Sequence, residues 1–296
     1  MKSIAVIGSG TMGNGIAHTF AQFGNKVILV DISQEALDKG IATISKNLDR
    51  QVAKGIISEE EKASTLSNIT GITLIDSRLA DIDLVIEAAS ENFEIKKSVF
   101  QQLDSVCKPS CILASNTSSI SITRIAAATK RPSQVIGMHF MNPVPLMKLV
   151  EIINGYSTSK EVTDAIVAAT TQLNKIPVVA NDYPGFVANK ILMPMINEAI
   201  ITLHEGVAGV AEIDTIMKLG MAHPMGPLQL ADFIGLDVCL SILKVLQDGF
   251  GNPKYAPSPL LVNMVTAGHL GIKSKIGFYD YSAGTKELVV APLFKN

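Results

Sequence analysis

The glycine-rich segment Gly-Ser-Gly-Thr-Met-Gly at residues 8–13 constrains the fold of this chain more than any other feature. It directly follows a short β-rich run at residues 3–7 and opens a helical pattern that extends to Gly24. A strand that ends in a G-x-G-x-x-G turn and continues as a helix is typical of a dinucleotide-binding Rossmann unit. The order of these parts disfavours the alternative, a glycine-rich turn that binds nothing.

Each glycine of the segment has its own steric purpose in such a unit. Gly8 permits the tight turn, Gly10 lets the backbone approach a pyrophosphate, and Gly13 lets the helix pack on the strand. The helix N-terminus then presents N–H groups and the positive end of its dipole to the phosphates. The residues expected beside the cofactor here are Gly8, Gly10, Thr11, Met12 and Gly13.

Asp31 indicates which cofactor binds. It ends a second β-rich run at residues 27–31, roughly 20 residues after the glycines. A carboxylate at this place accepts hydrogen bonds from the adenosine ribose hydroxyls and would repel the 2′-phosphate of NADP. The sequence therefore predicts NAD as the cofactor.

The rest of the first half alternates strand-like and helical patterns. Further apolar, strand-like runs lie at residues 84–88, 111–116 and 134–140, and helical patterns cover residues 33–55 and 92–106. Continuous apolar strands that alternate with helices are typical of a parallel sheet that is covered on both faces.

The second half has only helical patterns. They follow the turn-rich segment Asn-Asp-Tyr-Pro-Gly-Phe and cover residues 187–205, 211–219, 227–249 and 258–267. We therefore predict an α/β protein with two domains. Residues 1–183 form a Rossmann-type, doubly wound, mostly parallel sheet, and residues 184–296 form a smaller, all-α domain.

Composition excludes several classes of partner. The net charge of −2 gives no electrostatic reason to expect nucleic acid or an anionic membrane as a partner. No apolar run reaches the length of a membrane span, and we expect no signal peptide before the first strand. The three cysteines and five histidines lack metal-ligand spacing, so we expect no metal site and a reducing, cytoplasmic compartment.

A lone histidine and a glutamate flank two prolines in the segment of residues 138–151. If residues 135–140 and 147–153 form an antiparallel hairpin, His139 comes opposite Glu151; the loop length permits this register but does not fix it. The carboxylate would then bind one imidazole nitrogen and leave the other for a substrate, as in general acid–base catalysis. The alternative is a buried histidine that is only structural.

Hydroxyl side chains gather at Ser115–Ser119, after a predicted strand. Ligands of parallel sheets bind at the carboxyl ends of the strands, so we expect these hydroxyls to lie near Asp31 and His139. They could bind a substrate oxygen, although Ser118 could instead cap the following helix.

Five longer segments resemble motifs of the L-3-hydroxyacyl-CoA dehydrogenase family: ASNTSSISIT, GMHFMNPVPLMKLVEII, PGFVANKIL, HPMGPLQLADFIGLD and GFYDY. The resemblance covers residues 1 to about 281 and extends in particular to stand-alone bacterial members that act on 3-hydroxybutyryl-CoA. It implies an NAD-dependent interconversion of (3S)-3-hydroxyacyl-CoA and 3-ketoacyl-CoA, such as acetoacetyl-CoA. It also implies a homodimer that forms through the helical domain.

The resemblance implies roles for individual residues. His139 and Glu151 correspond to the pair that transfers the proton, and Ser118 and Asn189 to residues that bind substrate beside that pair. The residues implied to contact NAD are Glu91, Lys96, Asn116, Asn142 and Lys273, and those implied to contact coenzyme A are Lys54 and Arg50. The last two lie four apart on one helical face, and they could equally belong to an ordinary solvated surface.

A second class of enzymes has a similar two-domain layout: the NAD-dependent dehydrogenases of β-hydroxyacids and sugar acids. Some of these use a lysine on the first helix of the second domain as the base, and Lys190 lies in that region. This alternative leaves His139 and Glu151 without a role, so the acyl-CoA hypothesis is preferred.

Overall fold

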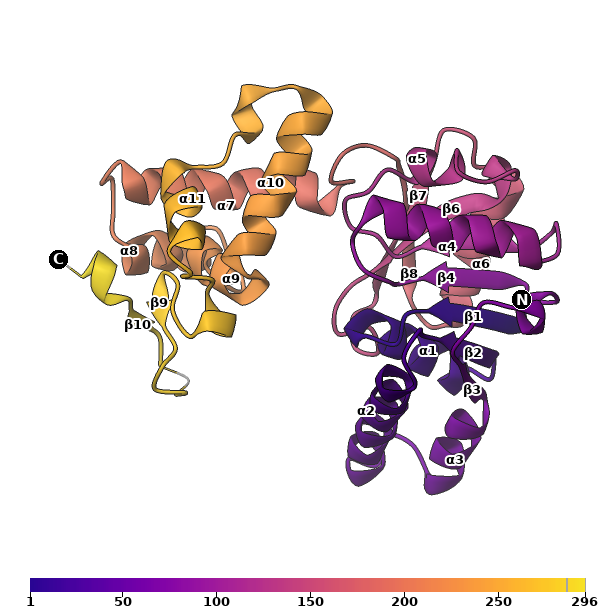
Figure 1. The fold of residues 1–296 in the computed structure, drawn as a ribbon. Coiled ribbons are helices and arrows are strands. Elements are labelled where there is room, and N and C mark those ends of the chain that lie inside the picture. Colours follow the sequence, from indigo (N-terminus) through magenta and orange to yellow (C-terminus); the bar gives the residue numbers. More distant parts are fainter. Residues whose placement is uncertain (286, 296) are drawn as a thin grey trace. The chain divides into compact units, whose positions relative to one another are not determined.

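The structure is a computed structural model that describes residues 1–285 and 287–295. The chain divides into two compact units, residues 1–183 and 184–296 (Figure 1). The first unit is α/β and the second is mainly helical, so the predicted fold class is confirmed. None of the described helices is long and apolar enough to cross a membrane.

An eight-stranded sheet forms the centre of the first unit, in the order β3-β2-β1-β4-β5-β6-β7-β8. Neighbouring strands are parallel except β6 and β7, which form an antiparallel pair. Every residue of β4 and β5 is buried, because helices cover both faces of the sheet there. The strands are β1 Ser3–Ile7, β2 Lys26–Val30, β3 Ile69–Ile72, β4 Leu84–Glu87, β5 Ile112–Ser115, β6 Val135–Phe140, β7 Leu149–Asn154 and β8 Ile176–Asn181.

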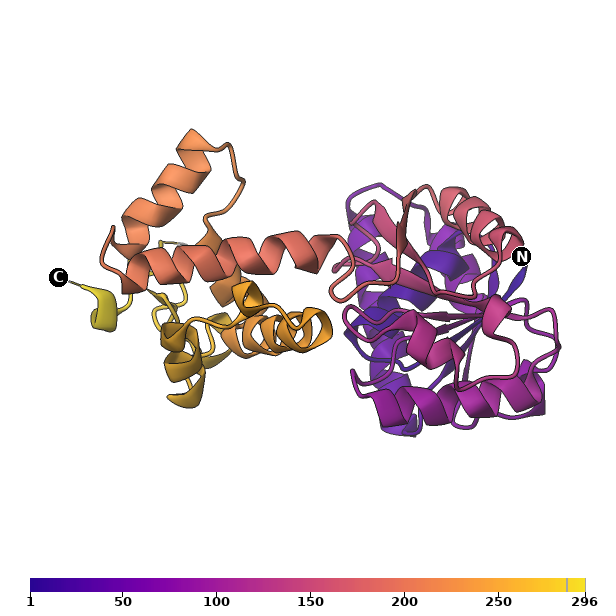
Figure 2. The same cartoon turned by 90° about the horizontal axis from the view of Figure 1, so that it is seen from above.

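The helices of the first unit lie on both sides of the sheet, as Figure 2 shows for α4 and α6. Two of them begin with side-chain caps. Ser33 accepts a hydrogen bond from the backbone N–H of Ala36 at the start of α2, and Ser58 and Glu61 form a capping box at α3. The helices are α1 Thr11–Gln22, α2 Gln34–Ala53, α3 Glu59–Ser67, α4 Phe93–Val106, α5 Ile122–Ala126 and α6 Lys160–Gln172.

Strands β3 and β8 and helix α6 were not predicted from the sequence. Strand β3 contains Gly71, and two of its four residues are exposed, so it lacks an apolar pattern. Strand β8 is the edge of the sheet, which is where a strand tolerates a proline such as Pro177. None of the residues of β8 is fully buried, so the strand lacks the alternation of buried apolar and exposed polar residues that would predict it.

Helices α7 to α11 surround a second hydrophobic core. The single helix predicted over residues 227–249 is wrong, because Gly235 has a φ of +103° and separates α9 from α10. Pro194 lies inside α7, which continues past it as one helix. The elements of this unit are α7 Ala188–His204, α8 Val210–Thr215, a π-helix Ile216–Gly220, α9 Pro227–Ile234, α10 Leu236–Phe250, α11 Pro259–Thr266, and the paired strands β9 Tyr279–Asp280 and β10 Val289–Val290.

Two buried carboxylates connect the C-terminal segment to these helices. Asp232 accepts hydrogen bonds from the backbone N–H groups of Phe278 (3.0 Å) and Tyr279 (2.9 Å), and Asp214 accepts one from the Tyr279 hydroxyl (2.8 Å). Burial raises the pKa of Asp232 to about 6. The sequence after Tyr281 has no clear helical or strand pattern, yet it contains β10, which pairs with β9. Lys286 and Asn296 lie outside the described residues.

Candidate active site

The glycine-rich turn between β1 and α1 has the geometry that a pyrophosphate requires. Gly8 has a φ of +97°, and a Cβ atom added there would lie 2.7 Å from the carbonyl oxygen of Ala88. A Cβ atom at Gly13 would lie 1.8 Å from the carbonyl oxygen of Gly8, whereas one at Gly10 would have nothing within 4 Å. Packing therefore requires two of the glycines, and the third leaves open space beside the N-terminus of α1. That helix has no side-chain cap, so its first N–H groups can bind a phosphate.

Asp31 lies beside this turn, directly after β2. Its Oδ2 atom accepts hydrogen bonds from the backbone N–H and from the hydroxyl of Ser9, each 2.8 Å long. Asp31 also lines a cavity of about 430 Å³, whose wall includes the apolar side chains of Ile32, Leu74 and Val99. An apolar wall for an adenine and a carboxylate for its ribose are what the adenosine of NAD needs. The residues present therefore fit this cofactor.

His139 and Glu151 face each other across the antiparallel pair β6–β7. The predicted hairpin register is confirmed, and the distance from His139 Nδ1 to Glu151 Oε2 is 2.7 Å. Glu151 is buried, with 4% of its surface exposed, whereas His139 is partly exposed. A carboxylate acceptor keeps a proton on Nδ1, so Nε2 is the ring nitrogen that can accept a second proton.

The loop of residues 141–148 joins these two strands and carries Asn142. Lys175, which precedes β8, donates hydrogen bonds from Nζ to the carbonyl oxygens of Val144 (2.6 Å) and Met147 (2.7 Å). Burial lowers the pKa of this lysine. This contact could not be predicted from the sequence, because the partners of Lys175 are backbone atoms about 30 residues away along the chain.

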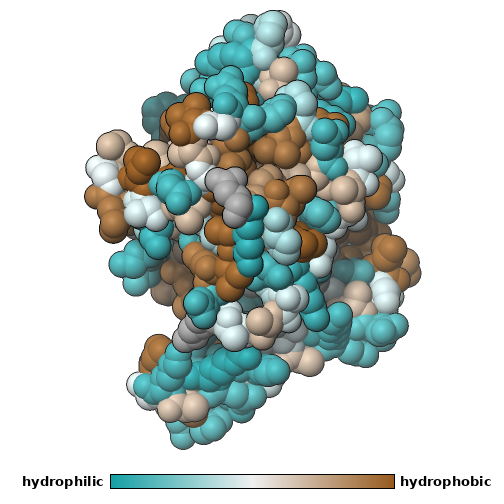
Figure 3. Space-filling model, turned by 90° about the vertical axis from the view of Figure 1, so that its left-hand side faces the viewer, coloured by the Kyte–Doolittle hydropathy of each residue, from teal (hydrophilic) through white to brown (hydrophobic). Residues whose placement is uncertain are grey.

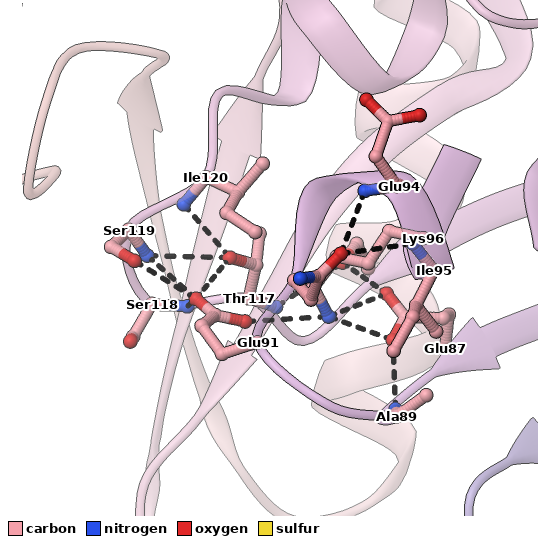
Figure 4. Close-up of polar contacts among 12 residues, drawn as sticks. Glu87, Ala89, Glu91, Glu94, Ile95, Lys96, Thr117, Ser118, Ser119 and Ile120 are labelled. Carbon is pink, nitrogen blue, oxygen red and sulfur yellow. Dashed lines mark hydrogen bonds and ion pairs between the residues drawn. The ribbon is translucent and has the colours of Figure 1, made fainter.

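Glu91 holds the hydroxyl-rich turn that follows β5. Its Oε1 atom accepts hydrogen bonds from the Thr117 hydroxyl (2.5 Å) and from the backbone N–H groups of Ser118 (3.1 Å) and Ser119 (3.2 Å), as Figure 4 shows. Burial alone would raise the pKa of Glu91. The Lys96 ammonium and the hydroxyls of Thr117 and Ser119 outweigh that effect, so the pKa of Glu91 is lowered.

Lys96, predicted to contact the cofactor, is a buried residue with 1% of its surface exposed. Its Nζ atom lies 2.7 Å and 2.9 Å from the two carboxylate oxygens of Glu87 and 3.3 Å from Glu91 Oε2. Glu87 was not predicted from the sequence as a site residue. The available signal was a charged residue at the end of the apolar run Leu-Val-Ile-Glu.

Two further side chains shape the same edge of the sheet. Asn116 accepts a hydrogen bond from the backbone N–H of Phe140 (2.9 Å) and so connects the ends of β5 and β6. Ser121 caps α5, because its hydroxyl accepts a hydrogen bond from the backbone N–H of Arg124 (3.1 Å). The alternative that Ser118 caps this helix is therefore wrong.

Three of the candidate residues belong to the second unit. Asn189 lies in the first turn of α7, and the ammonium of the adjacent Lys190 lies 4.3 Å from the centre of the Phe250 ring. Lys273 forms an ion pair with Asp237 at the start of α10.

The coenzyme A candidates Arg50 and Lys54 lie at the C-terminal end of α2, where both are exposed. A cavity of about 470 Å³ includes Gln51 of the same helix, and its wall also contains Ile56 and Leu146. This part of the unit therefore combines surface cations with an apolar recess. Within the described residues, no group of three or more His, Cys, Asp or Glu side chains could hold a metal ion.

Comparison with known proteins identifies the family to which nearly the whole chain is similar. The model of the 3-hydroxyacyl-CoA dehydrogenase NAD-binding domain matches residues 3–183, and that of the C-terminal domain matches residues 185–281. The chain is 55% identical over 281 residues to a 3-hydroxybutyryl-CoA dehydrogenase of Bradyrhizobium diazoefficiens, with 95% of this chain and 96% of that protein covered. It is 42% identical over 292 residues to the mitochondrial hydroxyacyl-coenzyme A dehydrogenase of Rattus norvegicus, with 95% and 91% covered. A crystal structure of (S)-3-hydroxybutyryl-CoA dehydrogenase from Ralstonia eutropha matches with a TM-score of 0.93 at 49% identity, with 95% and 99% covered.

The Rossmann unit and its glycine turn define an NAD-dependent dehydrogenase, and the predicted cofactor is confirmed. The chain belongs to the 3-hydroxyacyl-CoA dehydrogenase family. This result favours the acyl-CoA hypothesis over a dehydrogenase of free β-hydroxyacids or sugar acids.

Proposed function

We propose that this enzyme interconverts (3S)-3-hydroxybutyryl-CoA and acetoacetyl-CoA with NAD. The observation that carries the proposal is the 2.7 Å contact between His139 and Glu151 at the carboxyl edge of a NAD-binding sheet. The choice of a four-carbon acyl group is supported by two relatives that are named 3-hydroxybutyryl-CoA dehydrogenases and match nearly the full chain at more than half identity.

In the proposed reaction, His139 is the general base. Oxidation of a secondary alcohol requires the hydroxyl proton to leave as the carbonyl forms, and histidine exchanges protons near neutral pH. The Nε2 atom of His139 takes this proton, while Glu151 keeps Nδ1 protonated and stabilises the imidazolium that results. NAD, when bound at the glycine turn, would supply the hydride acceptor for the carbon that carries this hydroxyl. In the reducing direction, His139 returns the proton to the substrate oxygen.

Other side chains bind the two ligands. Ser118 binds the substrate oxygen with its hydroxyl, and Asn189 contributes its amide to the thioester. The cofactor is held by the glycine turn and Asp31, with contributions from Glu91, Lys96, Asn116, Asn142 and Lys273. Because Lys96 is buried and Lys273 pairs with Asp237, these two cations contribute less directly than the glycine turn.

We propose that coenzyme A binds along the C-terminal end of α2, where the Lys54 ammonium contacts its phosphates. We predict that Lys54→Ala raises KM for acetoacetyl-CoA several-fold and leaves kcat and the Kd of NADH unchanged, because the lost interaction is the same in the ground state and the transition state. Steady-state kinetics with both substrates varied would test this. A wild-type KM would assign Lys54 to an ordinary solvated surface.

Substrate identity is tested by NADH oxidation with acetoacetyl-CoA, with free acetoacetate, and with oxidised sugar acids. The proposal expects turnover of the thioester and little turnover of the free acids. Preferential turnover of a free acid would contradict it and would favour the class of enzymes with a catalytic lysine near Lys190.

We further propose a homodimer that forms through the helical unit, in the cytoplasm. The helical unit exposes several large apolar side chains, and Figure 3, which faces this unit, shows apolar groups gathered between polar ones. The exposed apolar side chains of the helical unit include Val207, Ile216, Leu219, Met221 and Phe233. Three buried, free thiols suit a reducing compartment. Light scattering coupled to gel filtration would test the dimer, and a monomeric mass would contradict it.

A further inference from the structure

Glu87 is a buried acid to which the proposed chemistry gives no task. It is the last residue of β4 and has no exposed surface. Its carboxylate accepts hydrogen bonds from Lys96 Nζ, from the Ser115 hydroxyl (2.7 Å) and from the backbone N–H of Ala89 (2.7 Å). Burying an ion pair is costly, and an apolar pair of similar volume is often at least as stable. Stability alone therefore does not explain the Glu87–Lys96 pair.

Two chains of ion pairs and hydrogen bonds start at Glu87 and end on the same turn. In the first, Lys96 connects Glu87 to Glu91, and Glu91 accepts four hydrogen bonds from the turn at residues 117–119. In the second, the hydroxyl of Ser115 donates to Glu87 and accepts from the backbone N–H of Thr117 (3.2 Å).

Thr117 closes the network. Its hydroxyl donates to Glu91 and accepts from the backbone N–H of Ile120 (2.9 Å), so the turn is held before and after Ser118. The backbone N–H of Ser118 is itself bound to Glu91, and the Ser118 side chain points away from that carboxylate (Figure 4). The backbone that carries the Ser118 hydroxyl is therefore fixed from inside the unit.

We infer that Glu87 is a positioning residue: through Lys96 and Ser115 it fixes the turn that presents Ser118 to the substrate. The inference rests on the proposed function, because it gives Ser118 the substrate oxygen as its ligand. If the Glu87–Lys96 pair were only structural, its loss would affect folding but not the recognition of the substrate. A shift of a binding group by even 1 Å can cost a large factor in rate.

The test uses a matched pair of variants at the two ends of β4. Glu87→Gln removes the charge at the carboxyl end of β4, and Asp83→Asn removes the charge that precedes β4, where Asp83 pairs with Lys108 at 2.7 Å. We expect kcat/KM for acetoacetyl-CoA to fall about 10- to 100-fold in Glu87→Gln, because a misplacement of a binding group by about 1 Å can cost on the order of 100-fold in rate. In Asp83→Asn it should stay within threefold of the wild type.

A double-mutant cycle separates positioning from stability. If Glu87 acts through Ser118, then Glu87→Gln added to Ser118→Ala lowers kcat/KM by less than threefold further. Multiplied losses would overturn the inference. If Glu87→Gln does not fold, the variant Glu87→Met with Lys96→Met removes both buried charges, and wild-type kcat/KM in that folded protein would also overturn it. A wild-type chain that does not reduce acetoacetyl-CoA would contradict the proposed function, and the inference with it.

Discussion

At the scale of single residues, Asp31 is expected to decide between the two nicotinamide cofactors. Its carboxylate is fixed by two hydrogen bonds from Ser9 and lines the cavity that suits an adenosine. A fixed carboxylate binds ribose hydroxyls and repels a 2′-phosphate, so it discriminates by attraction and by repulsion. We predict that the wild type strongly prefers NADH to NADPH. In Asp31→Ser, the ratio of kcat/KM with NADH to kcat/KM with NADPH should be lower than in the wild type. Equal values for both cofactors in the wild type would refute this role.

A second prediction at this scale concerns His18, a fully buried residue of α1. Burial lowers the pKa of His18 to about 4, from an ordinary value of 6.5. Between these two pH values the unfolded chain binds the extra proton and the folded chain does not, so stability is full above pH 6.5 and falls as the pH falls toward 4. The expected loss at pH 4.5 is about 2 to 3 kcal/mol.

Urea unfolding at pH 7 and pH 4.5 measures this effect. His18→Gln should lose much less stability between the two pH values than the wild type does, because glutamine does not titrate. His204→Gln is the control, since His204 is exposed at the end of α7. An equal pH dependence in His18→Gln and in the wild type would show that other groups cause the acid sensitivity.

At the scale of elements, the hairpin β6–β7 separates two tasks. Strand pairing sets the distance between His139 and Glu151, whereas Lys175 holds the loop of residues 141–148. We predict that Lys175→Met, which leaves two loop carbonyls without their charged donor, raises KM for NADH and acetoacetyl-CoA several-fold, while kcat stays within about threefold. The control Lys160→Met removes a lysine of an exposed ion pair. A large fall in kcat with unchanged KM would show that the loop, rather than the pairing of the strands, sets the distance between His139 and Glu151.

At the scale of the whole molecule, patterns that repeat along the chain were predictable from the sequence. The central strands are buried on both faces, so each is a continuous apolar run, and the glycine turn fixes where the first of them ends. The edge strands β3 and β8 lack such a pattern because much of their surface is exposed.

The candidate site was predictable to a similar extent. The His139–Glu151 contact follows from the register of one short hairpin, so local spacing was sufficient to find it. The Glu87–Lys96 pair depends on which face of α4 turns toward β4, and the Lys175 contacts depend on how β8 pairs with β7. Such contacts arise from tertiary packing, which the sequence pattern of a single element does not contain.

Whether His139 and Glu151 act together in proton transfer is decided by the kcat of Glu151→Gln with acetoacetyl-CoA and NADH. The amide has nearly the shape of the carboxylate but cannot stabilise an imidazolium by its charge, so the fold and the Kd of NADH should be retained. We predict that kcat falls by roughly two to four orders of magnitude, the range typical of lost general acid–base assistance. His139→Gln should be at least as severe, and the double variant should be little worse than His139→Gln alone, because the two residues act as a unit. Wild-type kcat in Glu151→Gln, or losses that multiply in the double variant, would contradict the account.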